Sequence, residues 1–596
     1  MSRIQRTPEN LFTIPKGAFV VNKRYVYINT SNKYVPAEKK KTPGGKGYTG
    51  HDSVCIGVLK DPEDRSCRMF YANTKFRERN SLDVLPDPPA VSDSIAIGLQ
   101  CLIRRASEDS GLSEDLALVF GSEDAALVLD LASYMIARGS AVMQHFPAWA
   151  RDNALFSKTI RSDSYIGTFL KSHLTIPKIA SFRQEWLKRN IGSGYVYLCY
   201  DSTNVNSQAE GISIVQRGHA KDDPSLCQVN TDYVIRQEDG LPLTYLHSPG
   251  SVTDIAQAKE MIGFINETSR LTGVQVTLCL ICDRGYISVR NLRHMDEVGI
   301  SYLLMLRSDL RVYKDLAEQY LDQVRSYKNI LDMPDGDERY GITVPCSLYP
   351  DGPECYAHIY WSASYYSMKR QSVVHTINAQ RLELEAFIRK SQGHCFDEKE
   401  LSNKFPPYFK LKLEPGEPQV TIQKKRGRGQ GTKEVMKPTV VIAGYEDDEA
   451  AINREILKAG IIIMVSRDEM TAQQAEDRYH KRDCVEKAFE ALKSHLGMDK
   501  LGVMTEEAIH GKGLIWFVAS ILYALMFNKT EKLRETDRKN YTTCAMVDQL
   551  IAIKADKDLF SQTYKRRYKL TKKQTSILNC FGVDEDYVDE QIRSVT

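Results

Sequence analysis

The chain has 596 residues, of which 42% are hydrophobic and 26% are charged, a composition that suits several folded domains and excludes a mostly disordered chain. Its 80 Lys and Arg residues nearly balance 77 Asp and Glu residues, so the net charge is only +3. The total charge therefore does not indicate a nucleic-acid partner, which would have to be bound by local basic residues.

The N-terminal third is predicted to change from strands to helices. Residues 1–85 hold alternating apolar runs at 25–28 and 54–58, which indicate a β-rich region. The Pro-rich stretch 86–89 is a plausible boundary. Residues 86–190 then keep apolar side chains at helical spacing, as at Leu127, Leu131 and Met135.

From residue 191 the pattern favours an α/β layer with a mixed sheet. Apolar strands are predicted at 195–200 and 274–282, with shorter ones at 211–215, 241–246 and 302–306. Helices are predicted at 253–268 and 287–298. Three neighbouring strands followed by strands alternating with helices are typical of such a layer.

Residues 310–460 interrupt this order and are predicted to form a β-rich insertion, with Tyr-rich strands and a basic, Gly-rich loop at 424–433. A buried strand returns at 461–465. Thr471 and Gln474 then form a capping-box signature ahead of one long helix, residues 472–495. The apolar run 514–527 is too short to span a bilayer and indicates a buried helix, and 530–596 is predicted to be helical.

The 13 cysteines are scattered through the chain, which suits free thiols in a reducing cytoplasm. The single C-x-x-C, Cys279 to Cys282, lies in a predicted strand, where side chains three apart point to opposite faces. A zinc site is therefore not expected. The N-terminus lacks the apolar stretch of a secretory signal.

Two acidic residues, Asp201 and Asp283, end two of the predicted apolar strands. A carboxylate at the end of a buried strand is held rigidly at the edge of the sheet, where α/β proteins place their sites, and it suits a metal ligand. Asp also commonly caps the turn after a strand, so either residue alone fits both interpretations.

A third acid lies on the predicted helix in the pattern Y-x2-R-x3-E-x6-K, formed by Tyr479, Arg482, Glu486 and Lys493. At about 100° per residue, all four project from one stripe of a helix. One acid, two cations and a phenol suit a surface facing a polyanion. The alternative is a solvated face on which Arg482 and Glu486 pair with each other.

Together, Asp201 in D-S-T, Asp283 in D-R-G-Y and the Y-x2-R-x3-E-x6-K pattern resemble the DDE transposases of bacterial insertion sequences. The resemblance covers about 195–310 and 461–527. It implies a ribonuclease H-like core, with a mixed five-stranded sheet and flanking helices, interrupted by a large β-rich insertion. Val465, Ser466 and Arg467 depart from the Thr-Asn-like pair expected before the helix.

The resemblance implies that Asp201, Asp283 and Glu486 are catalytic and hold two Mg²⁺ ions, with Mn²⁺ as a substitute. Two such ions suit phosphodiester cleavage, and hard oxygen ligands select them. Tyr479, Arg482 and Lys493 would bind DNA phosphates near the scissile bond. Glu490 lies only about 40° from Glu486 on the predicted helix, and motif register favours Glu486.

Further DNA-binding candidates lie in the D-R-G-Y motif and in the insertion. Arg284 follows Asp283, and Lys424, Lys425, Arg426 and Arg428 lie in the basic loop, which also fits a plain solvated loop. Hairpin-forming relatives hold a flipped base with a Trp of the insertion, and Trp361 is the only Trp of 310–460. A core aromatic residue is the alternative.

The expected organisation is 1–85 β-rich, 86–190 helical and binding the DNA end, 191–309 core, 310–460 insertion, 461–529 core and 530–596 helical. The expected function is metal-dependent cleavage at insertion-sequence ends and strand transfer. The partners would be double-stranded terminal inverted repeats and target DNA, bound by a homodimer in the bacterial cytoplasm at the nucleoid, with no membrane. Alternatives are a catalytically silent DNA-binding descendant, a nuclease that cuts without joining, and a two-carboxylate glycosidase.

Overall fold

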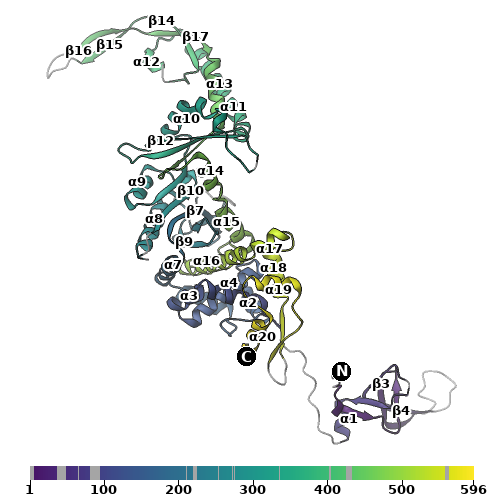
Figure 1. Ribbon diagram of the computed structural model, residues 1–596. Coiled ribbons are helices and arrows are strands. Elements are labelled where there is room, and N and C mark those ends of the chain that lie inside the picture. The colour runs from purple at the N-terminus through teal and green to yellow at the C-terminus, as the bar shows by residue number, and fades with distance from the viewer. Residues whose placement is uncertain are drawn as a thin grey trace. The chain divides into compact units, whose positions relative to one another are not determined.

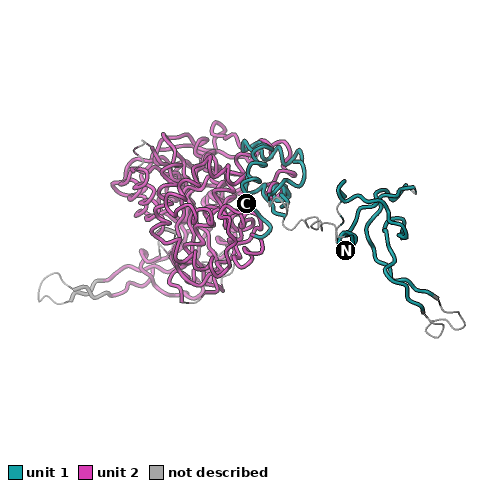
Figure 2. The backbone as a smooth tube through the Cα atoms, turned by 90° about the horizontal axis from the view of Figure 1, so that it is seen from below, with its two compact units in different colours: residues 1–101, 151–154, 548–596 teal, residues 102–150, 155–547 magenta. Residues whose placement is uncertain are grey.

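A computed structural model describes residues 4, 6–35, 48–64, 66–80, 94–209, 211–218, 225–252, 254–271, 273, 276–334, 336–401, 404–424, 432–557 and 563–595. The chain forms two compact units. One comprises residues 1–101, 151–154 and 548–596, and the other comprises residues 102–150 and 155–547 (Figure 2).

The first unit contains an antiparallel sheet near the N-terminus. Its strand order is β1-β5-β4-β3-β2, and its bounds are β1 (Leu11–Thr13), β2 (Ala18–Val21), β3 (Tyr25–Val35), β4 (Tyr48–Leu59) and β5 (Met69–Ala72). Helix α1 (Thr74–Arg79) begins at Asn73, whose side chain accepts a hydrogen bond from the Phe76 amide. Val26, Ile56 and Phe70 form the buried core of this sheet.

The first unit also contains a second, three-stranded sheet of order β20-β19-β6. Its strands are β6 (Ser94–Ala96), β19 (Lys554–Lys557) and β20 (Tyr564–Arg566), and helices α19 (Lys572–Asn579) and α20 (Glu585–Ser594) follow. The sequence had indicated a helical C-terminal region at 530–596, and this prediction is wrong in part, because the region also contains the two strands β19 and β20. Its two strands are so short that helical periodicity in the flanking residues hides them.

The second unit begins with a helical layer. Its helices are α2 (Gly98–Asp109, in this unit from residue 102), α3 (Leu112–Phe120), α4 (Ser122–Arg138), α5 (Phe146–Arg151, in this unit up to residue 150), α6 (Asp163–Ser172) and α7 (Ile176–Asn190). Helix α16 (Glu506–Lys529) packs against α4 and α6, and α17 (Glu531–Thr536) and α18 (Thr543–Ile551) follow it. By length and composition α16 is apolar enough to cross a bilayer, but 78% of that window is buried, as expected of a core helix.

The centre of the second unit is a mixed sheet with the strand order β12-β13-β18-β11-β10-β7-β8-β9, of which Figure 1 labels β12, β10, β7 and β9. The strands are β7 (Gly194–Ser207), β8 (Cys227–Arg236), β9 (Pro242–Pro249), β10 (Val276–Cys282), β11 (Ser301–Met305), β12 (Arg339–Cys346), β13 (Cys355–Ser362) and β18 (Ile461–Ser466). Among the described strands of this sheet, the parallel pairs are those of β10 with β7 and with β11. Helices α8 (Asp254–Leu271) and α9 (Val289–Val298) complete this mixed α/β fold.

The sheet has eight strands where the sequence predicted five. The additional pairing comes from residues 310–460, the segment that the sequence predicted to be an insertion and that is called the inserted segment below. Its strand β13 pairs with β18 along the whole length of β18, and β12 pairs with β13. The insertion therefore extends the central sheet, which periodicity within single strands cannot reveal.

The inserted segment is also less β-rich than predicted. Its remaining elements are α10 (Arg311–Val324), α11 (Ala363–Lys390), α12 (Glu398–Leu401), β14 (Phe409–Pro415), β15 (Gln419–Lys424), β16 (Thr432–Lys437), β17 (Val440–Asp447) and α13 (Glu449–Leu457). The 28-residue helix α11 was missed because its Tyr-rich start resembles a strand, whereas the Ser362 side chain caps it at the Tyr365 amide. Strands β14 and β17, and β15 and β16, form two-stranded ribbons.

Candidate active site

The three predicted acids line one cavity of about 450 Å³ in the second unit. Asp201 comes from β7, Asp283 follows β10, and Glu486 lies on α15 (Asp483–His495). The other lining residues are Ser202, Thr203, Arg482, Phe489, Glu490, Lys493 and Ser494. Residues up to 293 positions apart in the chain, Asp201 and Ser494, therefore meet at one place.

Asp201 lies inside strand β7 and not at its end. The strand continues to Ser207 because residues 198–207 form an unbroken antiparallel ladder with β8. The parallel ladder with β10 stops at the Tyr200–Cys282 pair. Asp201 is thus the first residue of β7 beyond β10, and its carboxylate accepts hydrogen bonds from the Ser202 amide at 2.8 Å and the Tyr286 hydroxyl at 3.4 Å.

Asp283 combines the two roles between which the sequence left a choice. It follows the last residue of β10 and lines the cavity. Its side chain also caps the short 3-10 helix Arg284–Tyr286, accepting a hydrogen bond from the Arg284 amide at 2.7 Å. The cap fixes the carboxylate beside the cavity, while the Arg284 residue is exposed.

The predicted long helix is two helices, α14 (Ala472–His480) and α15, separated by a turn at Lys481 and Arg482. The predicted capping box of Thr471 and Gln474 is confirmed at the start of α14. The turn leaves Arg482 at the N-terminal cap of α15, with its amide bonded to the Tyr479 carbonyl. The break divides the signature, because Tyr479 belongs to α14 and Glu486 and Lys493 belong to α15.

Arg482 links two of the three acids. Its Nη1 lies 3.4 Å from Asp201 Oδ2, and its Nη2 lies 2.5 Å from Glu486 Oε1. Burial lowers the pKa of Arg482, but interactions with Tyr479, Asp201 and Glu486 outweigh burial and leave that pKa above its ordinary value. The guanidinium is therefore a fixed positive charge between the carboxylates.

Tyr479 lies beneath Arg482 and not on the cavity wall. Its ring centroid is 5.6 Å from the Arg482 guanidinium carbon, and burial raises the pKa of its hydroxyl well above the usual value. At neutral pH the phenol is neutral. In this arrangement it supports the arginine, and its predicted contact with a DNA phosphate stays a prediction.

The cavity suits a divalent metal ion in the chemistry of its donors. Three carboxylates and the hydroxyl residues Ser202 and Thr203 supply the hard oxygen atoms that Mg²⁺ and Mn²⁺ prefer. Within the described part of the chain, no three His, Cys, Asp or Glu side chains are already grouped closely enough to hold an ion. Arg482 lies between two of the acids instead.

Sequence reasoning missed several residues of this site. Phe489 and Ser494 line the cavity without any signal in the motif. Ser202 and Tyr286 had a signal, since they belong to the quoted D-S-T and D-R-G-Y contexts. Glu490 lines the same cavity as Glu486, so position alone does not distinguish the two acids.

Trp361 is not part of this cavity. Its side chain is in the interior, 7% exposed, and its Nε1 donates to the Leu457 carbonyl at 3.0 Å. The Arg325 guanidinium lies 4.7 Å from the ring centroid. These contacts match the core-aromatic alternative. In the basic loop, Lys424 ends β15, whereas Lys425, Arg426 and Arg428 lie outside the described residues.

The cavity and its strands fall within a recognised sequence family. A family model described as a transposase DDE domain matches residues 192–522, more than half of the chain. The chain belongs to this family of DDE transposases. Among solved structures, a cryo-electron-microscopy structure of a piggyBac transposase synaptic complex with hairpin DNA is 9% identical, with a TM-score of 0.34, covering 85% of this chain and 87% of that chain. No curated protein matches the chain.

Proposed function

We propose that this chain is a DNA transposase that cuts the ends of an insertion sequence and joins them to target DNA. The observation that carries the proposal is the meeting of Asp201, Asp283 and Glu486 at one cavity inside the matched residues 192–522. The strand order β9-β8-β7-β10-β11, with β8 antiparallel to its neighbours, supports a ribonuclease H-like core.

In this proposal the three carboxylates hold two Mg²⁺ ions, with Mn²⁺ as a substitute. When bound, such a pair activates the attacking oxygen and stabilises the leaving oxygen at the scissile phosphate. The chain's own contribution is placement. The hydrogen bonds of Asp201 with Ser202 and Tyr286, and the cap made by Asp283, hold the carboxylates at one edge of the sheet.

Arg482 and Lys493 supply the positive charge that a DNA backbone requires. Both line the cavity beside the acids, so a phosphate that enters meets cations and carboxylates at once. Arg482 would exchange Glu486 for a phosphate oxygen on DNA binding. The exposed Arg284 lies next to Asp283 and would extend the contact along the strand.

The remaining assignments rest on the family resemblance. Residues 86–190 would bind the terminal inverted repeat, the basic loop around Lys424 would follow the DNA backbone, and two copies would act together on paired ends. The protein would act at the nucleoid of a bacterial cytoplasm. A hairpin intermediate is part of this proposal.

The test uses the purified full-length protein and a duplex that carries the element's terminal repeat. We expect strand cleavage with Mg²⁺ or Mn²⁺, none with EDTA, and joining of the 3′ ends to a target plasmid. Asp201→Ala should abolish cleavage and retain DNA binding. Asp309→Ala is the matched control, because Asp309 is an exposed acid paired with Arg307.

Each failure of this test has a distinct meaning. Binding of the repeat by the wild-type protein without cleavage would indicate a silent DNA-binding descendant. Cleavage without joining would indicate a nuclease. Cleavage that survives Asp201→Ala would place the chemistry elsewhere.

A further inference from the structure

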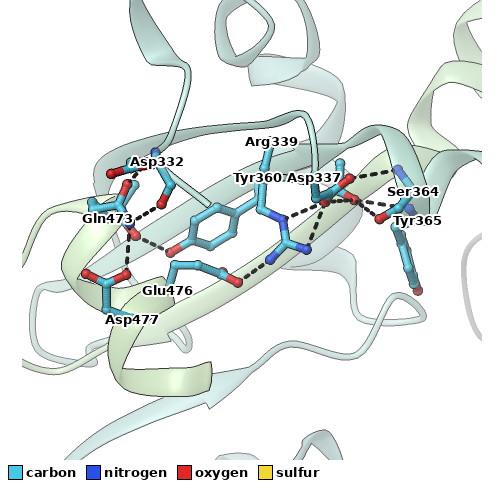
Figure 3. A network of polar contacts seen from close by, with 11 residues as sticks. Asp332, Asp337, Arg339, Tyr360, Ser364, Tyr365, Gln473, Glu476 and Asp477 are labelled. Atoms are coloured by element: carbon cyan, nitrogen blue, oxygen red, sulfur yellow. Dashed lines mark hydrogen bonds and ion pairs between the residues drawn. The ribbon is translucent and has the colours of Figure 1, made fainter. Parts of the chain in front are cut away.

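A network of polar side chains joins the inserted segment to helix α14 (Figure 3). Its centre is an ion pair between Arg339, the first residue of β12, and Glu476 on α14, 137 positions away. Glu476 is one of the few buried acids of the second unit, and burial raises the pKa of its carboxyl, which the Arg339 charge partly offsets. The pair is therefore a specific contact within the protein interior.

Asp337 closes the other side of the arginine. It accepts hydrogen bonds from Arg339 Nε and Nη2 at 3.2 and 3.0 Å. The same carboxylate accepts from the Ser362 hydroxyl at 2.8 Å and from the Ser364 amide at 3.2 Å. Residues 362 and 364 lie where β13 passes into α11. Asp337 and the start of α11 thus fix the Arg339 side chain within the inserted segment, and the same side chain also binds Glu476 on α14.

Two further contacts fix the first turn of α14 to the same segment. The Tyr360 hydroxyl on β13 donates to the Ala472 carbonyl at 2.8 Å. Gln473 exchanges two hydrogen bonds with the backbone of Asp332, at 3.0 and 3.1 Å. At its far end α14 also contacts the core, where Gln237, the residue after β8, donates to the Arg478 carbonyl at 2.7 Å.

We infer that Arg339 is a positioning residue that sets α14, and through it Tyr479 and Arg482, at the carboxylate cavity. The inference rests on the proposed function, because it concerns the alignment of that site. The inserted segment thereby helps to align the active site, besides any contact of its own with DNA.

The geometry explains how the effect would reach the cavity. Glu476 lies three residues before Tyr479, less than one helical turn. The Arg482 amide bonds to the Tyr479 carbonyl across the turn, so a shift of α14 moves the base of the guanidinium. Arg482 meets Asp201 and Glu486 at the same time, and a displacement of about 1 Å at a reacting site costs roughly 10²-fold in rate.

The test compares Arg339→Met with Arg454→Met in the full-length protein. Arg454 is the matched control, because it also forms ion pairs inside the inserted segment, but its partners Glu318 and Asp322 lie on α10. The double variant Arg339→Met/Glu476→Gln removes both charges of the Arg339–Glu476 pair, so Glu476 is no longer a buried charge without its arginine, while Asp337 keeps its hydrogen bonds from Ser362 and Ser364. The measurements are single-turnover cleavage at saturating DNA, DNA affinity, and amide hydrogen exchange of residues 479–486.

We expect Arg339→Met to slow cleavage by roughly 10²-fold with DNA affinity changed less than about threefold. Exchange at 479–486 should rise at least about tenfold, and the Arg454 variant should show neither effect. The double variant should regain part of the thermal stability that Arg339→Met loses, while its cleavage stays at least about tenfold slow, because the alignment is still missing.

Equal losses in the Arg339 and Arg454 variants, or unchanged exchange at 479–486 in Arg339→Met, would overturn the inference. Full recovery of cleavage in the double variant would overturn it too, since burial of a lone charge would then explain the defect. The exchange measurement needs no cleavage. A wild-type protein that does not cut, together with a rise at 479–486 in Arg339→Met, would refute the proposed function and support the positioning contact.

Discussion

Two Arg–Glu ion pairs, whose acids lie on the adjacent helices α14 and α15, differ in the exposure of one partner. The side chains of Arg339 and Glu476 are 16% and 10% exposed, and those of Arg482 and Glu486 are 14% and 57% exposed. The arginines are equally buried, so the acids make the difference. Glu476 is enclosed by the inserted segment, whereas Glu486 opens into a cavity.

The comparison distinguishes an ion pair that stabilises the fold from an ion pair that is available for chemistry. A buried pair is strongly destabilised when one partner is removed, because the remaining charge has no water around it. An exposed pair contributes little to stability, and its acid is free to exchange partners when a ligand arrives. Two glutamates only ten positions apart, each paired with an arginine, thus suit a structural contact in one place and a chemical site in the other.

The largest expected effect tests the Arg482–Glu486 pair, whose acid is exposed. Glu486→Gln should slow cleavage by about 10³-fold or more, because a lost metal ligand removes several kcal/mol of stabilisation from the transition state. Glu490→Gln, on the same cavity wall, should stay within about threefold of wild type. Single-turnover cleavage of both variants checks this. The reverse order would assign the third acid to Glu490.

The second effect tests the buried Arg339–Glu476 pair through the stability of the folded protein. Glu476→Gln should lower the free energy of unfolding by roughly 3 kcal/mol, since it leaves Arg339 buried with one partner fewer. Glu486→Gln should lower it by less than about 1 kcal/mol. Urea denaturation of the two variants measures both values. A similar loss in each would remove the distinction between the pairs.

The third effect concerns the pH dependence of stability in the buried part of the inserted segment. Burial lowers the pKa of His358, on β13, from 6.5 to about 4, and its ring nitrogens contact Thr343 and Ser466. Above pH 6.5 the imidazole is neutral in both the folded and the unfolded chain. Between pH 6.5 and 4 only the unfolded chain binds the proton, so stability falls by roughly 3 kcal/mol as pH falls.

A comparison of wild type with His358→Gln across pH 4 to 8 checks this expectation. The variant lacks the titrating group, so its stability should fall less below pH 6.5 than that of the wild type. Parallel pH curves for the two proteins would contradict the lowered pKa.

The smallest effect concerns Trp361 on the same strand. Trp361→Phe removes the hydrogen bond to the Leu457 carbonyl and should cost about 1 to 2 kcal/mol of stability. If the ring serves packing alone, cleavage and hairpin yield should stay within about threefold of wild type. A selective loss of hairpin product in a stably folded variant would restore the base-stacking assignment.

Local patterns in the sequence were sufficient to predict much of the site. Asp201 and Asp283 follow apolar runs, and the spacing around Glu486 matches a known signature, so neighbouring residues carry the information. The capping box at Thr471 and the buried helix α16 are local features of the same kind, and both are confirmed. The mixed α/β class follows from the order of strands and helices.

Other features depend on partners far away in the chain. Strand β7 runs past Asp201 because β8 continues to pair with it, and the helix breaks at Lys481 without a Pro or Gly to signal it. The partner of Glu476 lies beyond the greater part of an insertion, and a charged residue on a predicted helix is ordinarily expected to face water. These contacts exist only once the sheet is assembled.

The pairing of β18 determines whether the inserted segment can be removed without disrupting the central sheet. All six residues of β18 pair with β13, but only three pair with β11. Excising residues 310–460 and closing the gap would leave a row of backbone amides and carbonyls on β18 without partners, directly before α14. Shortened forms of this protein, natural or engineered, should therefore trim the distal ribbons and keep residues 339–362.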